Sequence, residues 1–169
     1  MNSKLAVLIG IILGTVFSLF ITGIAFKFAA PTLFFKEVKS TYSFNKTVDL
    51  ITSRINKKDG WHVTNIIDQQ KEILDNGGAD IGKVKIIKFC NGKLSGEMLS
   101  ADESKFMATK MPLSISVYEK SDGRVIIGLS NGYVMARLFS ARREGAIMEK
   151  VITDMEDILG FMHFRFTML

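Results

Sequence analysis

The chain is 169 residues long, which is enough for one domain of ordinary size, and 47% of its residues are hydrophobic, which is high for a soluble protein. Its net charge of +5 is modest and scattered, with no basic stripe carrying interleaved aromatic residues, so the sequence argues against nucleic-acid binding. A charge of this kind instead suits a domain that lies beside anionic lipid headgroups.

The hydrophobic excess lies at the N-terminus. Residues 5–26 include no charged side chain, and Lys4 and Lys27 flank this run. As a helix the run is about 33 Å long, enough to cross a hydrocarbon core of about 30 Å. Gly23 and Ala25 also resemble the small residues of a signal-peptidase site, but the apolar run is longer than that of an ordinary signal peptide. We therefore expect residues 1–27 to form an uncleaved transmembrane anchor.

Residues 28–39 are predicted to form a juxtamembrane connector. Pro31 is expected to end or kink the helix, because proline removes a helical hydrogen bond. Phe34 and Phe35 are expected to lie at the level of the lipid headgroups or to contact a membrane partner.

Residues 40–160 alternate between helical and strand patterns, which predicts an α+β domain. Strands are expected at 42–44, 61–64, 83–89, 113–119 and 124–130, the last two joined by a hairpin turn at 120–123. Helices are expected at 46–57 with Asn45 as the N-cap, at 68–74, in part of 94–107 and at 142–159. The first of these helices has Val48, Ile51 and Ile55 on one apolar face.

The tail, residues 161–169, alternates between apolar and polar side chains. Phe164 and Phe166 share one face with two methionines. This pattern predicts an edge strand, a partner-binding strand or a segment at the membrane surface. Arg142 and Arg143 open the last predicted helix, where the helix dipole disfavours cations. They are expected to contact lipid headgroups or an acidic partner, with a plain exposed pair as the alternative.

Cys90 follows a predicted strand and is the most interesting residue for chemistry. Its thiolate could bind haem iron or a soft metal, with His62 or a methionine such as Met111 as the second ligand. The alternative is a buried cysteine that packs as a small hydrophobe, beside a structural histidine. The chain has no Cys-x-x-Cys-His segment, so covalent c-type haem is excluded. No nucleophile–base pair favours a hydrolase or transferase, so we expect no catalytic residues.

Several short segments, taken in order, resemble the family called domain of unknown function 302. They are residues 42–48, 60–63, 67–68, 86–93, 111–112 and 116–123. The resemblance covers roughly residues 40–159. It implies a compact α+β domain with a mainly antiparallel sheet of four or five strands packed with helices, often dimeric and without an established reaction.

The chain is similar to the membrane-anchored branch of this family, in which an N-terminal helix precedes Cys-Asn-Pro-Lys and Met-Pro-Cys-Arg segments. Here residues 90–93 are Cys-Asn-Gly-Lys and residues 111–114 are Met-Pro-Leu-Ser, so the second thiol is missing and chemistry that needs two thiols is disfavoured. The branch implies a domain outside the cytoplasmic membrane. The flanking lysines favour the cytoplasmic side only weakly, and we follow the resemblance.

These observations predict a membrane-anchored, non-enzymatic binding or accessory module. We expect a small subunit of a respiratory or redox membrane complex, with its domain on the periplasmic or outer side of the inner membrane. Its expected partners are the lipid bilayer, a larger membrane complex or a second copy of the chain. The alternative function is a redox protein that binds haem or a soft metal non-covalently through Cys90.

Overall fold

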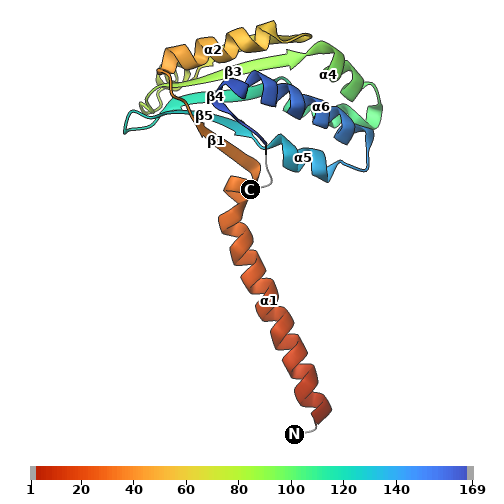
Figure 1. The fold of residues 1–169 in the computed structure, drawn as a ribbon. Helices are drawn as coiled ribbons and strands as arrows, with labels where there is room; N and C mark the ends of the chain where they lie inside the picture. The colour runs from red at the N-terminus through yellow and green to blue at the C-terminus, as the bar shows by residue number, and fades with distance from the viewer. Residues whose placement is uncertain (1–2, 167–169) are drawn as a thin grey trace. The chain divides into compact units, whose positions relative to one another are not determined.

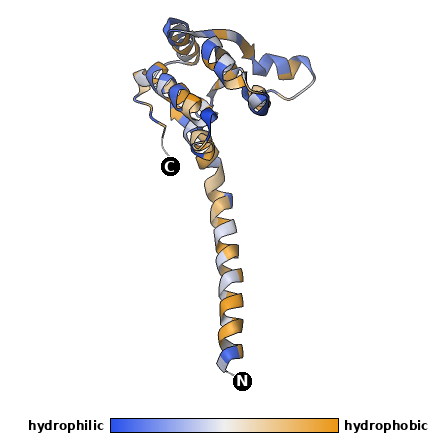
Figure 2. Ribbon diagram, turned by 90° about the vertical axis from the view of Figure 1, so that its right-hand side faces the viewer, coloured by the Kyte–Doolittle hydropathy of each residue, from blue (hydrophilic) through white to orange (hydrophobic). Residues whose placement is uncertain are grey.

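The computed structural model describes residues 3–166, and the chain divides into two compact units between Phe34 and Phe35. The first unit is one helix, α1 (Ser3–Phe34), and Figure 2 shows mostly white to orange residues along it. Its length and hydropathy suit a membrane span, although an N-terminal signal sequence has the same properties. The helix extends beyond the predicted anchor of residues 1–27 and does not end at Pro31. It continues through Pro31, a residue that helices in apolar surroundings tolerate.

The second unit is a five-stranded antiparallel sheet with helices (Figure 1). The strands lie in the order β1-β5-β4-β3-β2. They are β1 (Phe35–Lys39), β2 (Trp61–Asp68), β3 (Val84–Asn91), β4 (Leu113–Glu119) and β5 (Val125–Ser130). The helices are α2 (Phe44–Lys57), α3 (Gln69–Asp75), α4 (Gly92–Leu99), α5 (Gly132–Leu138) and α6 (Arg143–Ile158), with 3₁₀ helices η1 (Asp102–Lys110) and η2 (Gly160–Met162). The predicted fold class, an α+β domain with a mainly antiparallel sheet, is confirmed.

The hydrophobic core lies between one face of the sheet and the helices α2 and α6. Alternate residues of the central strands point into it, among them Ile87, Ile115 and Ile127, each at most 1% exposed. The predicted apolar face of α2 meets them, and Ile51 and Ile55 are fully buried. A smaller apolar cluster joins α4, η1 and α6 through two buried methionines and an isoleucine.

The connector predicted at residues 28–39 does not exist as a separate segment. Its first seven residues belong to α1, and its last five form the edge strand β1, which pairs with β5 from Phe35–Ser130 to Lys39–Ile126. The strand expected at 42–44 is absent, because these residues lead directly into α2. That helix begins at Phe44 with Ser43 as its N-cap, rather than Asn45.

The predicted strand in the tail is wrong for the residues that the structure describes. After η2, residues 163–166 have no regular structure, and residues 167–169 lie outside the described part of the chain. The Phe164 side chain is only 6% exposed and belongs to the core, where its ring meets that of Phe166 edge to face at 4.7 Å. The alternation therefore arises from local packing and not from a free strand.

Candidate functional site

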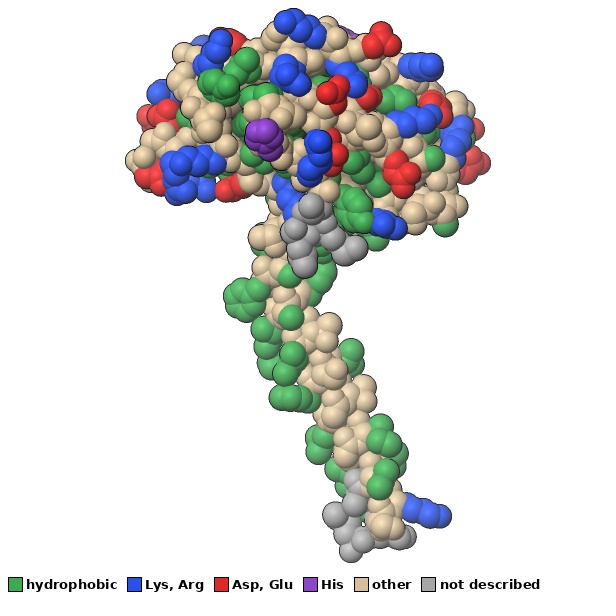
Figure 3. All heavy atoms as spheres, viewed as in Figure 1, with side chains coloured by type: hydrophobic (Ala, Val, Ile, Leu, Met, Phe, Trp, Pro, Cys, Tyr) green, Lys and Arg blue, Asp and Glu red, His purple; other side chains and the backbone are tan. Residues whose placement is uncertain are grey.

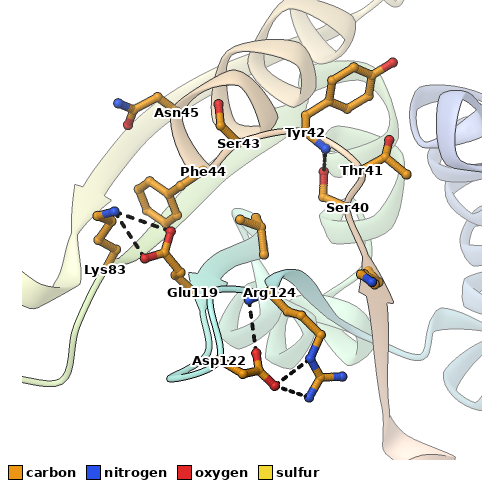
Figure 4. A pocket seen from close by; sticks show the side chains of 13 residues that line it. Ser40, Thr41, Tyr42, Ser43, Phe44, Asn45, Lys83, Glu119, Asp122 and Arg124 are labelled. Atoms are coloured by element: carbon orange, nitrogen blue, oxygen red, sulfur yellow. Dashed lines mark hydrogen bonds and ion pairs between the residues drawn. The ribbon is translucent and has the colours of Figure 1, made fainter.

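A polar hollow of about 600 Å³ lies at the end of the sheet where β1 ends and β5 begins (Figure 4). Three segments form it. They are the loop and first turn of α2, the β4–β5 hairpin, and the residue that precedes β3. Its lining residues are Lys39, Ser40, Thr41, Tyr42, Ser43, Phe44, Asn45, Lys83, Glu119, Asp122, Gly123, Arg124 and Val125.

The loop that walls the hollow is held by buried hydroxyl groups. The Ser40 backbone N–H donates to the Val125 carbonyl at 2.9 Å, which ties the loop to β5. The Ser40 and Thr47 hydroxyls share a hydrogen bond of 2.7 Å, and the Tyr42 N–H donates to Ser40 Oγ at 3.1 Å. Ser40 and Thr47 are 5% and 0% exposed. Buried polar groups satisfied in this way fix the loop in one conformation.

The charges of the hollow are mostly paired. Lys83 Nζ lies 3.2 Å from Glu119 Oε1, and Arg124 Nη2 lies 2.6 Å from Asp122 Oδ2. The side chain and the backbone N–H of Arg124 both bond to the Asp122 carboxylate and lower its pKa to about 2. Lys39 adds a third cation, so the lining carries one positive charge in excess.

The first turn of α2 adds a further electropositive element to the hollow. The hydroxyl of Ser43, the N-cap residue, makes no capping hydrogen bond, so the N–H groups of this turn are not satisfied by it. The hollow therefore has groups for holding a polar or anionic molecule. Its lining residues include no histidine and no cysteine.

The structure brings two of the three predicted ligands together. His62 of β2 and Cys90 of β3 are direct cross-strand partners, so their side chains project from the same face of the sheet. Cys90 is half-buried and its Sγ lies 3.1 Å from Ser95 Oγ, whereas His62 is exposed. Met111 lies elsewhere and packs against the methionine cluster of α4, η1 and α6. Among residues 3–166, no group of three His, Cys, Asp or Glu side chains is arranged to hold a metal ion.

Four of the other predicted contact residues are exposed, and two are wholly or partly buried. Phe34 and Phe35 are 38% and 64% exposed, and Arg142 and Arg143 are exposed as well. Phe164 is a core residue, so the prediction that it forms a surface contact is wrong. Phe166 is half-buried against the core, and its N–H donates to a glutamate of α6.

Sequence reasoning did not find the hollow. Its polar residues come from three segments far apart in the chain, and each segment alone is an ordinary turn. The one local signal is the density of hydroxyl-bearing and amide residues at 40–45 before a helix. Basic and acidic side chains are also interspersed on the visible face of the second unit, so no single-sign patch marks the site (Figure 3).

Comparison with known proteins identifies the family to which this chain belongs. Residues 36–161 match the family described as domain of unknown function DUF302. The chain belongs to the DUF302 family. The match begins at Lys36, two residues after the end of α1 at Phe34, so the DUF302 domain lies within the second unit and α1 precedes it.

A solved DUF302 structure supports the same fold. The crystal structure of an uncharacterized conserved DUF302 protein from Bacillus stearothermophilus superposes with a TM-score of 0.65 at 16% identity. The match covers 77% of this chain and 98% of that chain. No curated protein matches the chain. At this identity the likeness shows the DUF302 fold alone, and the family name carries no activity.

Proposed function

We propose that this protein is a membrane-anchored, non-enzymatic binding module that serves as a small accessory subunit of a respiratory or redox membrane complex. Its DUF302 domain lies on the outer side of the cytoplasmic membrane in this proposal. The observation that carries the proposal is the direct junction between α1 and β1, since α1 ends at Phe34 and the first strand of the sheet begins at Phe35.

The length of α1 supports an anchor. A helix of 32 residues is about 48 Å long, which exceeds the full thickness of about 40–45 Å that a bilayer has with its headgroups. Its most apolar window is not buried by any other part of the described chain. Such a surface is stable only in lipid or against other apolar helices.

The junction also favours retention of the helix over cleavage. Removal of a signal peptide after Ala25 would leave residues 26–34 as an apolar helical stub on the domain, with Phe26 and Phe28 55% and 76% exposed. An exposed stub of this kind promotes aggregation in water. The placement of the domain on the outer side rests on the resemblance to the membrane-anchored branch of the family.

A fractionation experiment tests the anchor. We expect the full chain to stay in the membrane pellet after an alkaline carbonate wash, and a Leu13→Arg variant to be released in part, because a charge at the centre of a span is unfavourable. A Lys46→Arg variant in α2 is the matched control and stays in the pellet. Mature protein that begins near Phe26 and remains soluble without detergent would refute the proposal.

Purification from native membranes tests the accessory role. In a mild detergent, we expect a C-terminally tagged chain to migrate with a defined set of membrane proteins, and protease added to intact spheroplasts to degrade the DUF302 domain. A chain that migrates alone in several detergents would contradict the accessory role. Protection from protease in spheroplasts, with digestion only after lysis, would contradict the outer location.

A second candidate function is binding of haem or a soft metal, and the register of β2 and β3 favours it. Because His62 and Cys90 are cross-strand partners, an imidazole and a thiolate start from positions about 5 Å apart. The test is an absorption spectrum of the purified protein with added haem or Cu⁺. A Soret or thiolate–metal band that Cys90→Ala and His62→Ala each abolish supports this function, with Met111→Leu as a control expected to have no effect. A protein that stays colourless and free of metal refutes it.

A further inference from the structure

The segment that follows β5 carries an exposed surface with the composition of a lipid-binding element. Leu138, in the last turn of α5, is 69% exposed and Phe106 of η1 is 51% exposed. Phe106 and Phe139 have ring centroids 6.2 Å apart, so they extend the same apolar surface from α5 to η1. We call this surface, formed by α5, residues 139–143 and Phe106, the α5 surface.

The α5 surface is strongly asymmetric in charge. Residues 132–143 include three arginines, all exposed, and no acidic residue. The next residue, Glu144, is only 8% exposed, and its carboxylate accepts a hydrogen bond from the Ser104 hydroxyl. This hydrogen bond and the charges of Arg142 and Arg143 lower the pKa of Glu144, so three arginines face one carboxylate and the surface keeps an excess of positive charge. Arg137 stacks on the Tyr133 ring at 5.1 Å and its Nε donates to the Tyr133 hydroxyl at 3.0 Å. Tyrosine, arginine and exposed leucine together are typical of the interface between water and lipid.

The sheet register places the start of α5 close to the start of β1, the strand that follows α1 in the chain. Phe35, which is bonded to the last residue of α1, is the cross-strand partner of Ser130. Antiparallel partners lie about 5 Å apart, and α5 begins two residues after Ser130. Leu138 therefore lies no more than about 22 Å from Phe35, the first residue of β1. The polar hollow lies at the opposite end of β1, beside Lys39.

We propose that the α5 surface docks on the headgroup region of an anionic bilayer and so fixes how the DUF302 domain stands on the membrane. This inference rests on the proposed function, because it requires α1 to be in the bilayer. Arginine side chains meet phosphate groups while Leu138 and Phe106 enter the upper acyl region. The hollow at the other end of the sheet then faces away from the lipid.

The test uses the full chain in nanodiscs of phosphatidylglycerol mixed with phosphatidylcholine. In a Cys90→Ser background, an environment-sensitive fluorophore is attached at one of three exposed positions through Ser140→Cys, Ser121→Cys or Phe17→Cys. Position 140 lies on the α5 surface, position 121 in the β4–β5 turn, and position 17 in α1. Spin-labelled lipids that carry the quencher at the headgroup or deep in the acyl chain report the depth of each fluorophore.

We expect headgroup-level quenching and a blue shift in emission at position 140, neither at position 121, and chain-level quenching at position 17. An Arg137→Glu, Arg142→Glu double variant is expected to lose the quenching at 140, and the charge-matched Lys46→Glu, Lys57→Glu control on α2 to keep it. If position 140 is quenched no more than position 121 while position 17 is quenched, the docking is refuted and the anchor stands. If position 17 is not quenched, the anchor itself is refuted.

Discussion

Truncation of Ile51 provides a direct test of the way in which α2 covers the sheet. The side chain is fully buried and lies on the face of α2 that it shares with Val48 and Ile55. Replacing a buried isoleucine with alanine loses the transfer free energy of the side-chain atoms that are removed. It also leaves a cavity that the surrounding strands cannot fill. The expected loss in the free energy of unfolding is about 2–5 kcal/mol for Ile51→Ala and about 0.5–1.5 kcal/mol for Ile51→Val.

The chain contains its own probe for this measurement. Trp61 is the single tryptophan, is 5% exposed, and has its ring 5.7 Å from that of Phe89. Its fluorescence during urea unfolding in detergent micelles therefore reports the DUF302 domain and not α1. We expect the midpoint for Ile51→Ala to fall while the slope stays constant. The control is Leu74→Ala, because Leu74 is 44% exposed and its loss changes stability by less than about 0.5 kcal/mol. Equal effects of the two variants would refute the placement of α2 over the core.

Three further predictions follow from local geometry. Burial and a hydrogen bond to Glu37 raise the pKa of Tyr118 to about 12. The protonated hydroxyl therefore stabilises the fold below pH 10, and this stabilisation is lost as the pH rises toward 12. The difference in ultraviolet titration between wild type and Tyr118→Phe measures this pKa, which Glu37→Gln should lower. Asp68→Ala removes the N-cap of α3 and should cost about 1 kcal/mol in urea unfolding, whereas Asp68→Asn should cost much less. Gly145→Ala would make the new Cβ collide with the Phe139 carbonyl oxygen, so we expect a loss of about 1–3 kcal/mol, and an unchanged thermal midpoint would contradict the close approach.

The central part of the fold was predictable because its signals are local. The strands at β3, β4 and β5 alternate or run apolar between clear turns, and the hairpin turn at 120–123 joins two of them as expected. The turn has Gly123 at a φ of +81°, a conformation that glycine adopts without strain. The helices α2 and α6 were predictable from apolar stripes with a period near 3.6 residues.

The edge strand β1 was missed because its stabilisation comes from a distant segment. Three of its five residues are charged, and only Val38 is an ordinary strand former that faces the core. Its backbone hydrogen bonds come from pairing with β5, and the sequence of β1 alone does not predict this pairing. The helix α5 was missed for a related reason. The pair Asn131-Gly132 is equally typical of a turn after a strand and of the start of a helix. Here Asn131 is the N-cap of α5 and Gly132 is its first residue.

The candidate site was predictable only in its components. The sequence singled out His62 and Cys90, but their register as direct partners depends on a bulge in β2 between Val63 and Asn65 that has no local signal. The hollow beside Lys39 depends on three segments meeting at one end of the sheet, so it required the topology.

The place of β1 in the sheet has a consequence for synthesis of the protein. The strand emerges from the ribosome immediately after α1, yet its partner β5 ends at Ser130, 95 positions later. Until β5 is made, β1 has no strand to pair with and its backbone groups stay unpaired. The first strand to be synthesised therefore takes its place in the sheet only after the last strand has been made.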